Sequence, residues 1–72
     1  MKTYVTFGQT HVHSINGKTL DKDCVAVITS DSAIEGRKKA FEIFGSKFSF
    51  EYSQNEWEGE SMIYYPRGYI NV

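Results

Sequence analysis

Two histidines separated by one residue are the feature of this 72-residue sequence that most directly suggests chemistry. On a β-strand, His11 and His13 would point the same way, so both imidazoles could reach one metal ion. A third ligand would have to come from Cys24, Asp21, Asp23 or a glutamate, and the spacing matches no established zinc pattern. We therefore expect ordinary histidines and no cofactor, and we keep a metal or small-ligand site at His11 and His13 as an alternative.

A catalytic centre is not indicated by the remaining nucleophiles. Cys24 begins an apolar run, which favours a small buried residue over a reactive thiolate. No nucleophile elbow or phosphate-cradling glycine loop surrounds the serines, histidines and aspartates. General acid–base work by the histidine pair would need a substrate-positioning group that the sequence does not identify. We expect a protein that is not an enzyme.

A basic cluster could contact nucleic acid instead: Arg37, Lys38 and Lys39. Consecutive residues fan out around a helix, so this cluster is more typical of a solvated surface than of a phosphate-binding face. Phe48 and Phe50 could imitate the stacking platform of single-strand binders, although in so small a chain these rings fit a core better. Direct nucleic-acid binding is therefore the less favoured hypothesis.

The last third of the chain carries the residue types most common at protein interfaces. Trp, Tyr and Arg are enriched in interaction hot spots, because each offers a large contact area with a polar group. The candidate partner-binding residues are Glu56, Trp57, Glu58, Glu60, Tyr64, Tyr65, Arg67 and Tyr69. Two interpretations of Trp57 remain open, since it could cap the small core or contact a partner.

The charge distribution supports a protein partner. Residues 1–50 carry seven Lys or Arg and five Asp or Glu, a balance of +2, whereas residues 51–72 carry Arg67 against four glutamates, a balance of −3. A dedicated nucleic-acid binder normally shows a clear basic excess. A hydrophobic content of 40% with a net charge of −1 excludes disorder of the whole chain.

The elements that would position these residues indicate one α+β domain over residues 1–72. Asn16-Gly17 is a strong hairpin signal, and Cys24 to Ile28 is typical of a central strand buried on both sides. Ser32 with Glu35 predicts a helix start, and Gly45 predicts its end. We expect the order β-β-α-β-β, with a small antiparallel sheet of three to five strands and one helix packed on one face.

The side-chain pattern predicts which faces are buried. Ile34, Phe41 and Phe44 should face the sheet from the helix. The alternation from Lys47 to Tyr52 predicts a strand with Phe48, Phe50 and Tyr52 on one face, and Met62 to Tyr65 predicts a further strand. An open sheet of this size has edges to cover, and a homodimer is one way to cover them.

Several of these motifs together resemble a family of very small proteins encoded by bacteriophages and prophages. The resemblance spans Thr6 to Tyr52 and rests on Thr6-Phe7-Gly8, the two histidines, Gly17, Val25-x-Val27, and the stretch from Arg37 through Ala40 and Phe41 to Phe44-Gly45-x-Lys47-Phe48-x-Phe50-x-Tyr52. It implies an accessory protein of the bacterial cytoplasm. By class, such proteins are similar to anti-CRISPR and related anti-defence inhibitors.

The hypothesis that follows is a non-catalytic interaction protein that binds and inhibits a host defence complex through its aromatic and acidic surface. Its partner would be a host protein or ribonucleoprotein complex such as CRISPR–Cas. One cysteine favours a reducing compartment, and the sequence has neither a signal-peptide pattern nor an apolar run long enough for a membrane span, so we expect a cytoplasmic location and no membrane partner.

Overall fold

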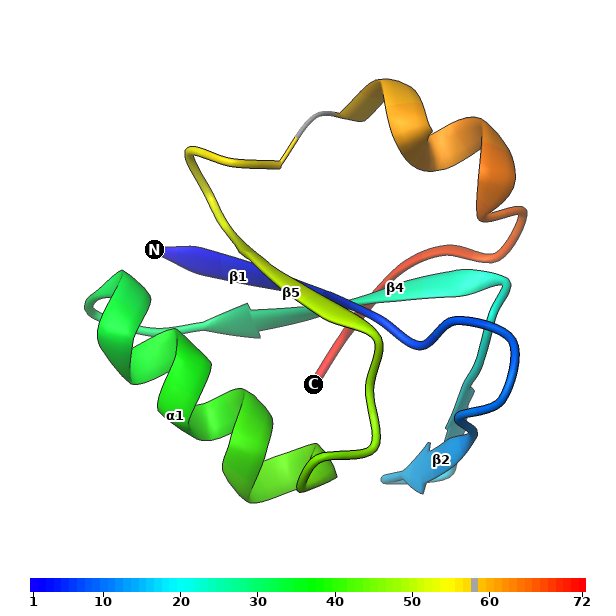
Figure 1. The fold of residues 1–72 in the computed structure, drawn as a ribbon, viewed down its shortest axis with the longest axis horizontal. Helices are drawn as coiled ribbons and strands as arrows, with labels where there is room; N and C mark the ends of the chain where they lie inside the picture. The colour runs from blue at the N-terminus through cyan, green and yellow to red at the C-terminus, as the bar shows by residue number, and fades with distance from the viewer. Residues whose placement is uncertain (58) are drawn as a thin grey trace.

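A four-stranded sheet with different coverings on its two faces forms the centre of the fold. The computed structural model describes residues 1–57 and 59–72, with all of their side chains except those of Glu60 and Ser61. The sheet has the order β5-β1-β4-β6, where the strands are β1 (Lys2–Thr6), β4 (Cys24–Thr29), β5 (Phe50–Ser53) and β6 (Gly68–Asn71). Helix α1 (Ala33–Phe44) lies on one side, and the 3₁₀ helix η1 (Gly59–Tyr64) lies on the other (Figure 1). The α+β class is confirmed.

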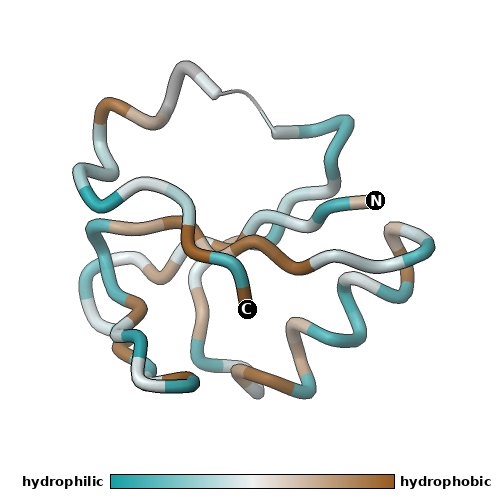
Figure 2. The backbone as a smooth tube through the Cα atoms, turned by 180° about the vertical axis from the view of Figure 1, so that it is seen from behind, coloured by the Kyte–Doolittle hydropathy of each residue, from teal (hydrophilic) through white to brown (hydrophobic). Residues whose placement is uncertain are grey.

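The apolar run that begins at Cys24 forms the middle of the molecule, as its composition predicts. Strand β4 is buried from Cys24 to Ile28 and lies between β1 and β6. Its hydrophobic stretch crosses the centre of the backbone trace in Figure 2. β-Branched residues are favoured in such strands because they pack well on both faces of a sheet.

The strand directions follow from two crossovers. β1 pairs antiparallel with β4 and with β5, as expected, whereas β6 pairs parallel with β4. The chain passes from β4 to β5 through α1 on one face, and then reaches the far edge of the sheet through η1 on the other face. A crossover connection joins parallel strands, so β6 runs in the same direction as β5. Since β5 and β4 also run in the same direction, β6 is parallel to β4.

A hairpin outside the main sheet is formed where Asn16-Gly17 predicts one. Strands β2 (His13–Ile15) and β3 (Lys18–Leu20) pair antiparallel. Asn16 and Gly17 both have positive φ, at 51° and 78°. Positive φ at both central residues defines the type I′ turn, whose twist matches that of the flanking strands. The buried Leu20 anchors this hairpin in the core.

Helix α1 begins and ends at the predicted residues but turns a different face to the sheet. Ser32 Oγ accepts a hydrogen bond from the Glu35 backbone N–H at 3.1 Å, and the Gly45 N–H donates to the Phe41 carbonyl oxygen at 2.8 Å. The prediction that Ile34 and Phe41 are buried is wrong, because they are 76% and 46% exposed. Small residues let the helix approach the sheet closely, and the buried set is Gly36, Ala40 and Phe44.

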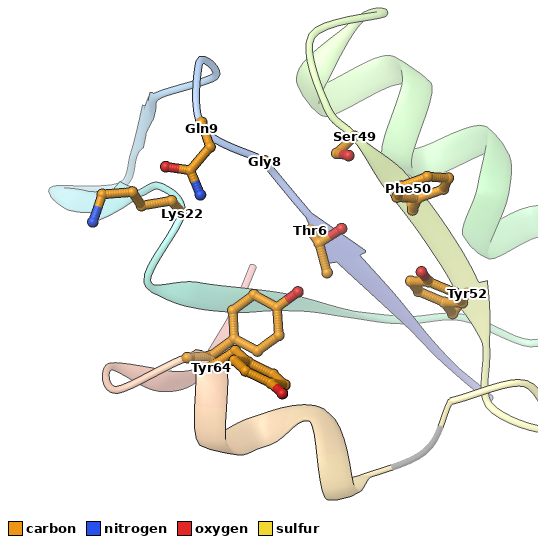
Figure 3. A pocket seen from close by; sticks show the side chains of 9 residues that line it. Thr6, Gly8, Gln9, Lys22, Ser49, Phe50, Tyr52 and Tyr64 are labelled. Atoms are coloured by element: carbon orange, nitrogen blue, oxygen red, sulfur yellow. The ribbon is translucent and has the colours of Figure 1, made fainter.

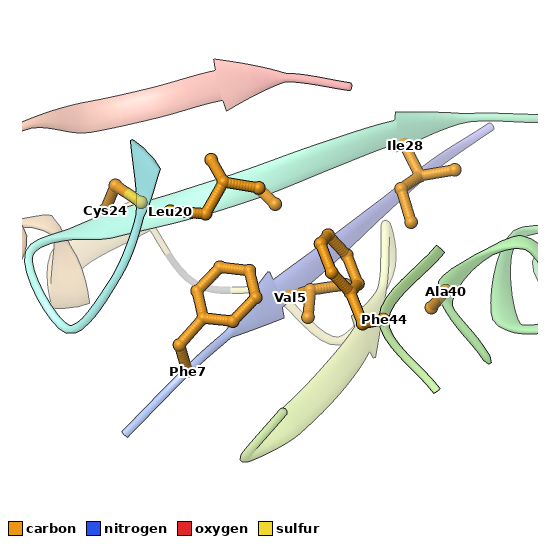
Figure 4. Close-up of a cluster of buried hydrophobic side chains, with 8 residues drawn as sticks. Val5, Phe7, Leu20, Cys24, Ile28, Ala40 and Phe44 are labelled. Carbon is orange, nitrogen blue, oxygen red and sulfur yellow. The ribbon is translucent and has the colours of Figure 1, made fainter. Parts of the chain in front are cut away.

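The hydrophobic core lies between α1, the sheet and the hairpin. Phe7 and Phe44 meet edge to face with a ring-centroid distance of 5.1 Å, next to Val5, Leu20 and Cys24. Figure 4 shows these side chains gathered between β1, β4 and the helix. Edge-to-face contacts of this kind stabilise a core beyond the area that they bury.

Two predictions for the second half of the chain are corrected. The segment that contains Met62 and Ile63 belongs to the 3₁₀ helix η1, so the prediction of a strand there is wrong. A short apolar run has no periodicity that would distinguish a strand from a helical segment. Phe48 precedes β5 and packs on the helix side against Phe41, while Phe50 and Tyr52 lie on the opposite face of the sheet.

No helix in the described part of the chain is long and apolar enough to cross a membrane.

Candidate functional site

The sheet face away from α1, on the side of η1 (Figure 1), is covered by a layer of aromatic rings. We call Tyr4, Tyr52, Trp57, Tyr65 and Tyr69 the aromatic layer. Along β1, Tyr4 points away from the core that holds Val5, because side chains alternate along a strand. The register places Tyr4 beside Tyr52 of β5 and beside Val27 of β4. These pairings bring the rings of distant segments onto one face.

Trp57 lies at the centre of the aromatic layer. Its ring stacks on that of Tyr4, with a centroid distance of 5.1 Å and an interplanar angle of 12°. The ring of Tyr52 lies 5.4 Å away, and those of Tyr65 and Tyr69 lie at 6.5 Å each. The indole Nε1–H donates a hydrogen bond to the Tyr69 hydroxyl at 2.9 Å. Trp57 is therefore a packing residue of this layer, although part of its surface remains accessible.

The turn before Trp57 is held by Glu56. Both the backbone N–H and the hydroxyl of Ser53 donate to Glu56 Oε1, at 3.1 and 2.9 Å. These two hydrogen bonds from Ser53 hold the pKa of the Glu56 carboxyl below its ordinary value. The carboxylate thus closes the turn from β5. Of the other acidic candidates, Glu58 lies outside the described residues, and so does the side chain of Glu60.

Arg67 is separated in role from the other candidate residues. Its Nη1 donates to Asp21 Oδ1 at 3.2 Å, and its backbone N–H donates to the Asp23 carbonyl oxygen at 2.9 Å. A hydrogen bond from the Asp23 backbone N–H and the nearby Arg67 guanidinium lower the pKa of Asp21. Arg67 therefore ties the start of β6 to the loop between the hairpin and β4.

A hollow of about 300 Å³ opens beside the aromatic layer, between the β1 and β5 strands and η1. Thr6, Ser49 and Tyr52 line one side, and Tyr64 lies across from Thr6 (Figure 3). Gln9 and Lys22 close one end, and Phe50 is at the other. The lining therefore combines hydroxyl and amide groups with aromatic walls, which is the usual composition of a recognition pocket.

Tyr65 is a half-buried tyrosine that lines this hollow. Burial raises the pKa of Tyr65 above its ordinary value of 10.0, the neighbouring Tyr52 raises it further, and the Thr6 hydroxyl opposes the change. The phenol is thus neutral at physiological pH and can act as a hydrogen-bond donor. Its ring belongs to the aromatic layer while it also lines the hollow.

Two large side chains that line the hollow are strongly exposed, and so is a residue that precedes one of them in η1. Phe50 is 61% exposed and Tyr64 is 73% exposed, and both line the hollow. Ile63, which precedes Tyr64 in η1, is 80% exposed. We call Phe50, Ile63 and Tyr64 the rim. Isolated exposed apolar residues are common in soluble proteins, but exposed rings that border a pocket are typical of an interaction site.

The two histidines are not brought together as metal ligands. His11 precedes β2, whereas the His13 ring packs against Phe44 and Phe7 with centroid distances of 4.9 and 5.6 Å. His13 Nε2 is engaged by the Lys47 carbonyl oxygen. Among residues 1–57 and 59–72, no three histidine, cysteine or acidic side chains gather in a way that could hold a metal ion.

The basic cluster of α1 is largely engaged in ion pairs. Arg37 Nε lies 3.7 Å from Glu51 Oε1, and Lys39 Nζ lies 3.7 Å from Glu35 Oε1. Lys38 is exposed. The aromatic platform that would accompany this cluster is not formed, because Phe48 and Phe50 lie on opposite faces of the sheet.

Several residues of the hollow belong to no recognisable pattern in the sequence. Thr6 comes from β1, whereas Gln9, Lys22 and Ser49 come from three different loops, and no spacing rule connects them. Only the pairing of β1 with β5 and the packing of η1 bring them together.

The comparisons with known proteins do not add a family to this description. No protein-family model, no curated protein and no solved structure matches the chain.

Proposed function

We propose that this protein is a non-catalytic binding protein that attaches to a protein partner through the rim and the hollow. The observation that supports this most directly is the position of Phe50 and Tyr64, two exposed aromatic side chains on either side of a polar-lined hollow. Aromatic anchors around a pocket are the usual arrangement of an interaction hot spot. The exposed rings contact the partner, and the hollow receives one of its side chains.

The aromatic layer supports this surface from below. The Tyr4–Trp57 stack and the Trp57–Tyr69 hydrogen bond fix the turn that leads into η1, and η1 carries Ile63 and Tyr64. A surface that is ordered before binding loses less conformational entropy when the partner docks. Trp57 therefore acts by positioning the rim, and its accessible edge adds contact area.

We further propose that the partner is a host defence complex such as CRISPR–Cas, and that the protein acts in the bacterial cytoplasm. The support for this more specific statement is the resemblance of residues 6–52 to small phage-encoded proteins, together with the size of the chain. Inhibition would then result from occupation of a surface that the complex needs.

The test is an affinity purification of the tagged protein from a bacterial lysate that contains a CRISPR–Cas complex. Three variants are compared with the wild type: Tyr64→Ser, Ile63→Ser and the matched control Ile34→Ser, which is an equally exposed apolar residue on the helix side. Exposed positions of this kind change stability by within about 0.5 kcal/mol, so folding should be retained in all three.

The expected result is a stoichiometric partner that is retained by wild type and Ile34→Ser but is bound at least about tenfold more weakly by the two η1 variants. Circular dichroism must show the same fold for each protein. Equal binding by all variants would overturn the assignment of the rim. A partner outside the defence complexes would leave the rim in place and overturn the identity proposed for the partner.

A further inference from the structure

The second edge of the sheet carries a groove that the proposed function does not use. β6 is an edge strand, since it pairs only with β4. Beside it, the turn and β3 of the hairpin form a facing wall, and the space between them is about 580 Å³. This β6 groove is lined by residues 17–19 of the hairpin and by residues 67 and 69–71.

The register of β6 shows which backbone groups point into the groove. The Val72 N–H donates to the Val27 carbonyl oxygen of β4 at 3.0 Å. Successive residues of a strand direct their backbone groups to opposite sides, so Ile70 also faces β4, while Tyr69 and Asn71 face outward. Lys18 Nζ donates to the Asn71 carbonyl oxygen at 3.3 Å from the hairpin side, which agrees with this outward direction.

An outward row of N–H and C=O groups is a template for an added strand. Tyr69 and Asn71 are both exposed, and both line the groove. An extended segment in the groove would pair with the outward groups of these two residues. It would replace the Lys18 ammonium on the Asn71 carbonyl oxygen and so release that ammonium.

The charged side chains that line the groove indicate which kind of peptide strand it would bind. Within the described residues that line it, the charged side chains are Lys18 and Arg67, and no carboxylate lines it. Arg67 shares its charge with Asp21, whereas Lys18 has no carboxylate within 4.0 Å among the described residues. A released Lys18 would therefore pair with an acidic side chain of the added strand.

We propose that the β6 groove binds an extended acidic peptide segment of a partner by strand addition to β6. The backbone of Tyr69 and Asn71 supplies the pairing, and Lys18 with Arg67 supplies the preference for acidic side chains. This site is separate from the rim, because Phe50 and Tyr64 line the other hollow and do not line the groove.

The test uses a fluorescein-labelled peptide of alternating valine and glutamate, and its counterpart with lysine in place of glutamate. Fluorescence anisotropy should show saturable binding of the acidic peptide only, and binding should weaken as salt is raised. Asn71→Pro removes an outward N–H without removing a bond to β4, and proline is tolerated on edge strands. We expect it to weaken binding at least tenfold, and Lys18→Glu to do the same.

Hydrogen exchange followed by NMR keeps the test decisive if Asn71→Pro disturbs the fold. In the free protein the Ile70 amide should exchange slowly and those of Tyr69 and Asn71 fast, and saturating acidic peptide should slow the latter two. Tyr64→Ser should leave peptide binding unchanged, which separates this proposal from the rim. Absence of peptide binding, unchanged exchange at Tyr69 and Asn71, or a self-association that Asn71→Pro abolishes would overturn it.

Discussion

At the scale of single residues, α1 and β1 approach each other closely at Gly36. A methyl group placed on Gly36 would lie 2.0 Å from Thr3 Oγ1 and 3.0 Å from Ser30 Oγ. Thr3 is fully buried, and its Oγ1 has no hydrogen-bond partner among the described residues. Gly36 therefore sets the distance between the helix and the sheet, which explains why the small-residue face of α1 is the buried one.

This contact predicts that Gly36→Ala destabilises the protein, whereas helix propensity alone would predict that it stabilises it. Alanine is favoured over glycine in a helix by about 1 kcal/mol. Gly36→Ala should nevertheless lower the free energy of unfolding by roughly 1–3 kcal/mol, because the added methyl must displace the helix. Urea denaturation followed by circular dichroism measures the change. Thr3→Ala should recover part of the loss, and a rise in stability on Gly36→Ala would contradict the close approach.

The hydrogen bond between Trp57 and Tyr69 can be tested by removing one oxygen atom. Tyr69→Phe deletes the acceptor of the indole N–H and should cost about 0.5–1.5 kcal/mol in the free energy of unfolding. Trp57 is the one tryptophan of the chain, so its fluorescence follows the transition directly. Tyr64→Phe is the matched control at an exposed hydroxyl and should leave the midpoint unchanged. Equal midpoints for both variants would mean that the bond contributes nothing.

At the scale of elements, the start of α1 depends on one side chain. Ser32 is the N-cap, and its hydroxyl satisfies the Glu35 N–H, which has no partner within the helix. Ser32→Ala should destabilise the protein by about 1 kcal/mol. Thermal unfolding compares it with Ser46→Ala, an exposed serine beyond the helix end. If the two substitutions had the same effect, the cap would not contribute to stability.

The elements differ in how far local sequence determines them. The Asn16-Gly17 hairpin and the two ends of α1 depend on contacts within a few residues, and they were predicted for that reason. The face that α1 buries was not, because it is set by Thr3, which is distant in sequence. The sequence around Ile63 predicts a strand, because nothing in it distinguishes a short strand from the 3₁₀ helix that forms there.

At the scale of the whole molecule, the candidate sites also depend on contacts between residues that are distant in sequence, which local sequence does not reveal. The sequence indicated an aromatic C-terminal third, and Trp57, Tyr65 and Tyr69 do come together in the aromatic layer. It could not indicate that Phe50 would join Tyr64 around a hollow, or that β6 would become an edge beside the hairpin. Both depend on the crossover of the chain from one edge of the sheet to the other, which is a property of the assembled fold.

The fold as a whole also makes stability depend on pH through the buried Cys24. Burial raises the pKa of this thiol above its ordinary value of 9.0, and a hydrogen bond with Asp21 opposes the shift only in part. In the unfolded chain the thiol ionises near its ordinary pKa, whereas in the folded protein a higher pH is needed to ionise it. Above that pKa the folded state therefore binds more protons, so stability must fall as the pH rises.

Urea midpoints at pH 7 and at about pH 9.5 test this linkage. Cys24→Ala should have a lower midpoint than the wild type at pH 7, because it loses packing in a fully buried position. Its further decrease on going to high pH should be smaller than that of the wild type, since the ionising group is gone. The titration of Tyr65 is common to both proteins and cancels in the difference. An identical pH dependence in the two proteins would mean that the Cys24 thiol ionises as readily in the folded protein as in the unfolded chain.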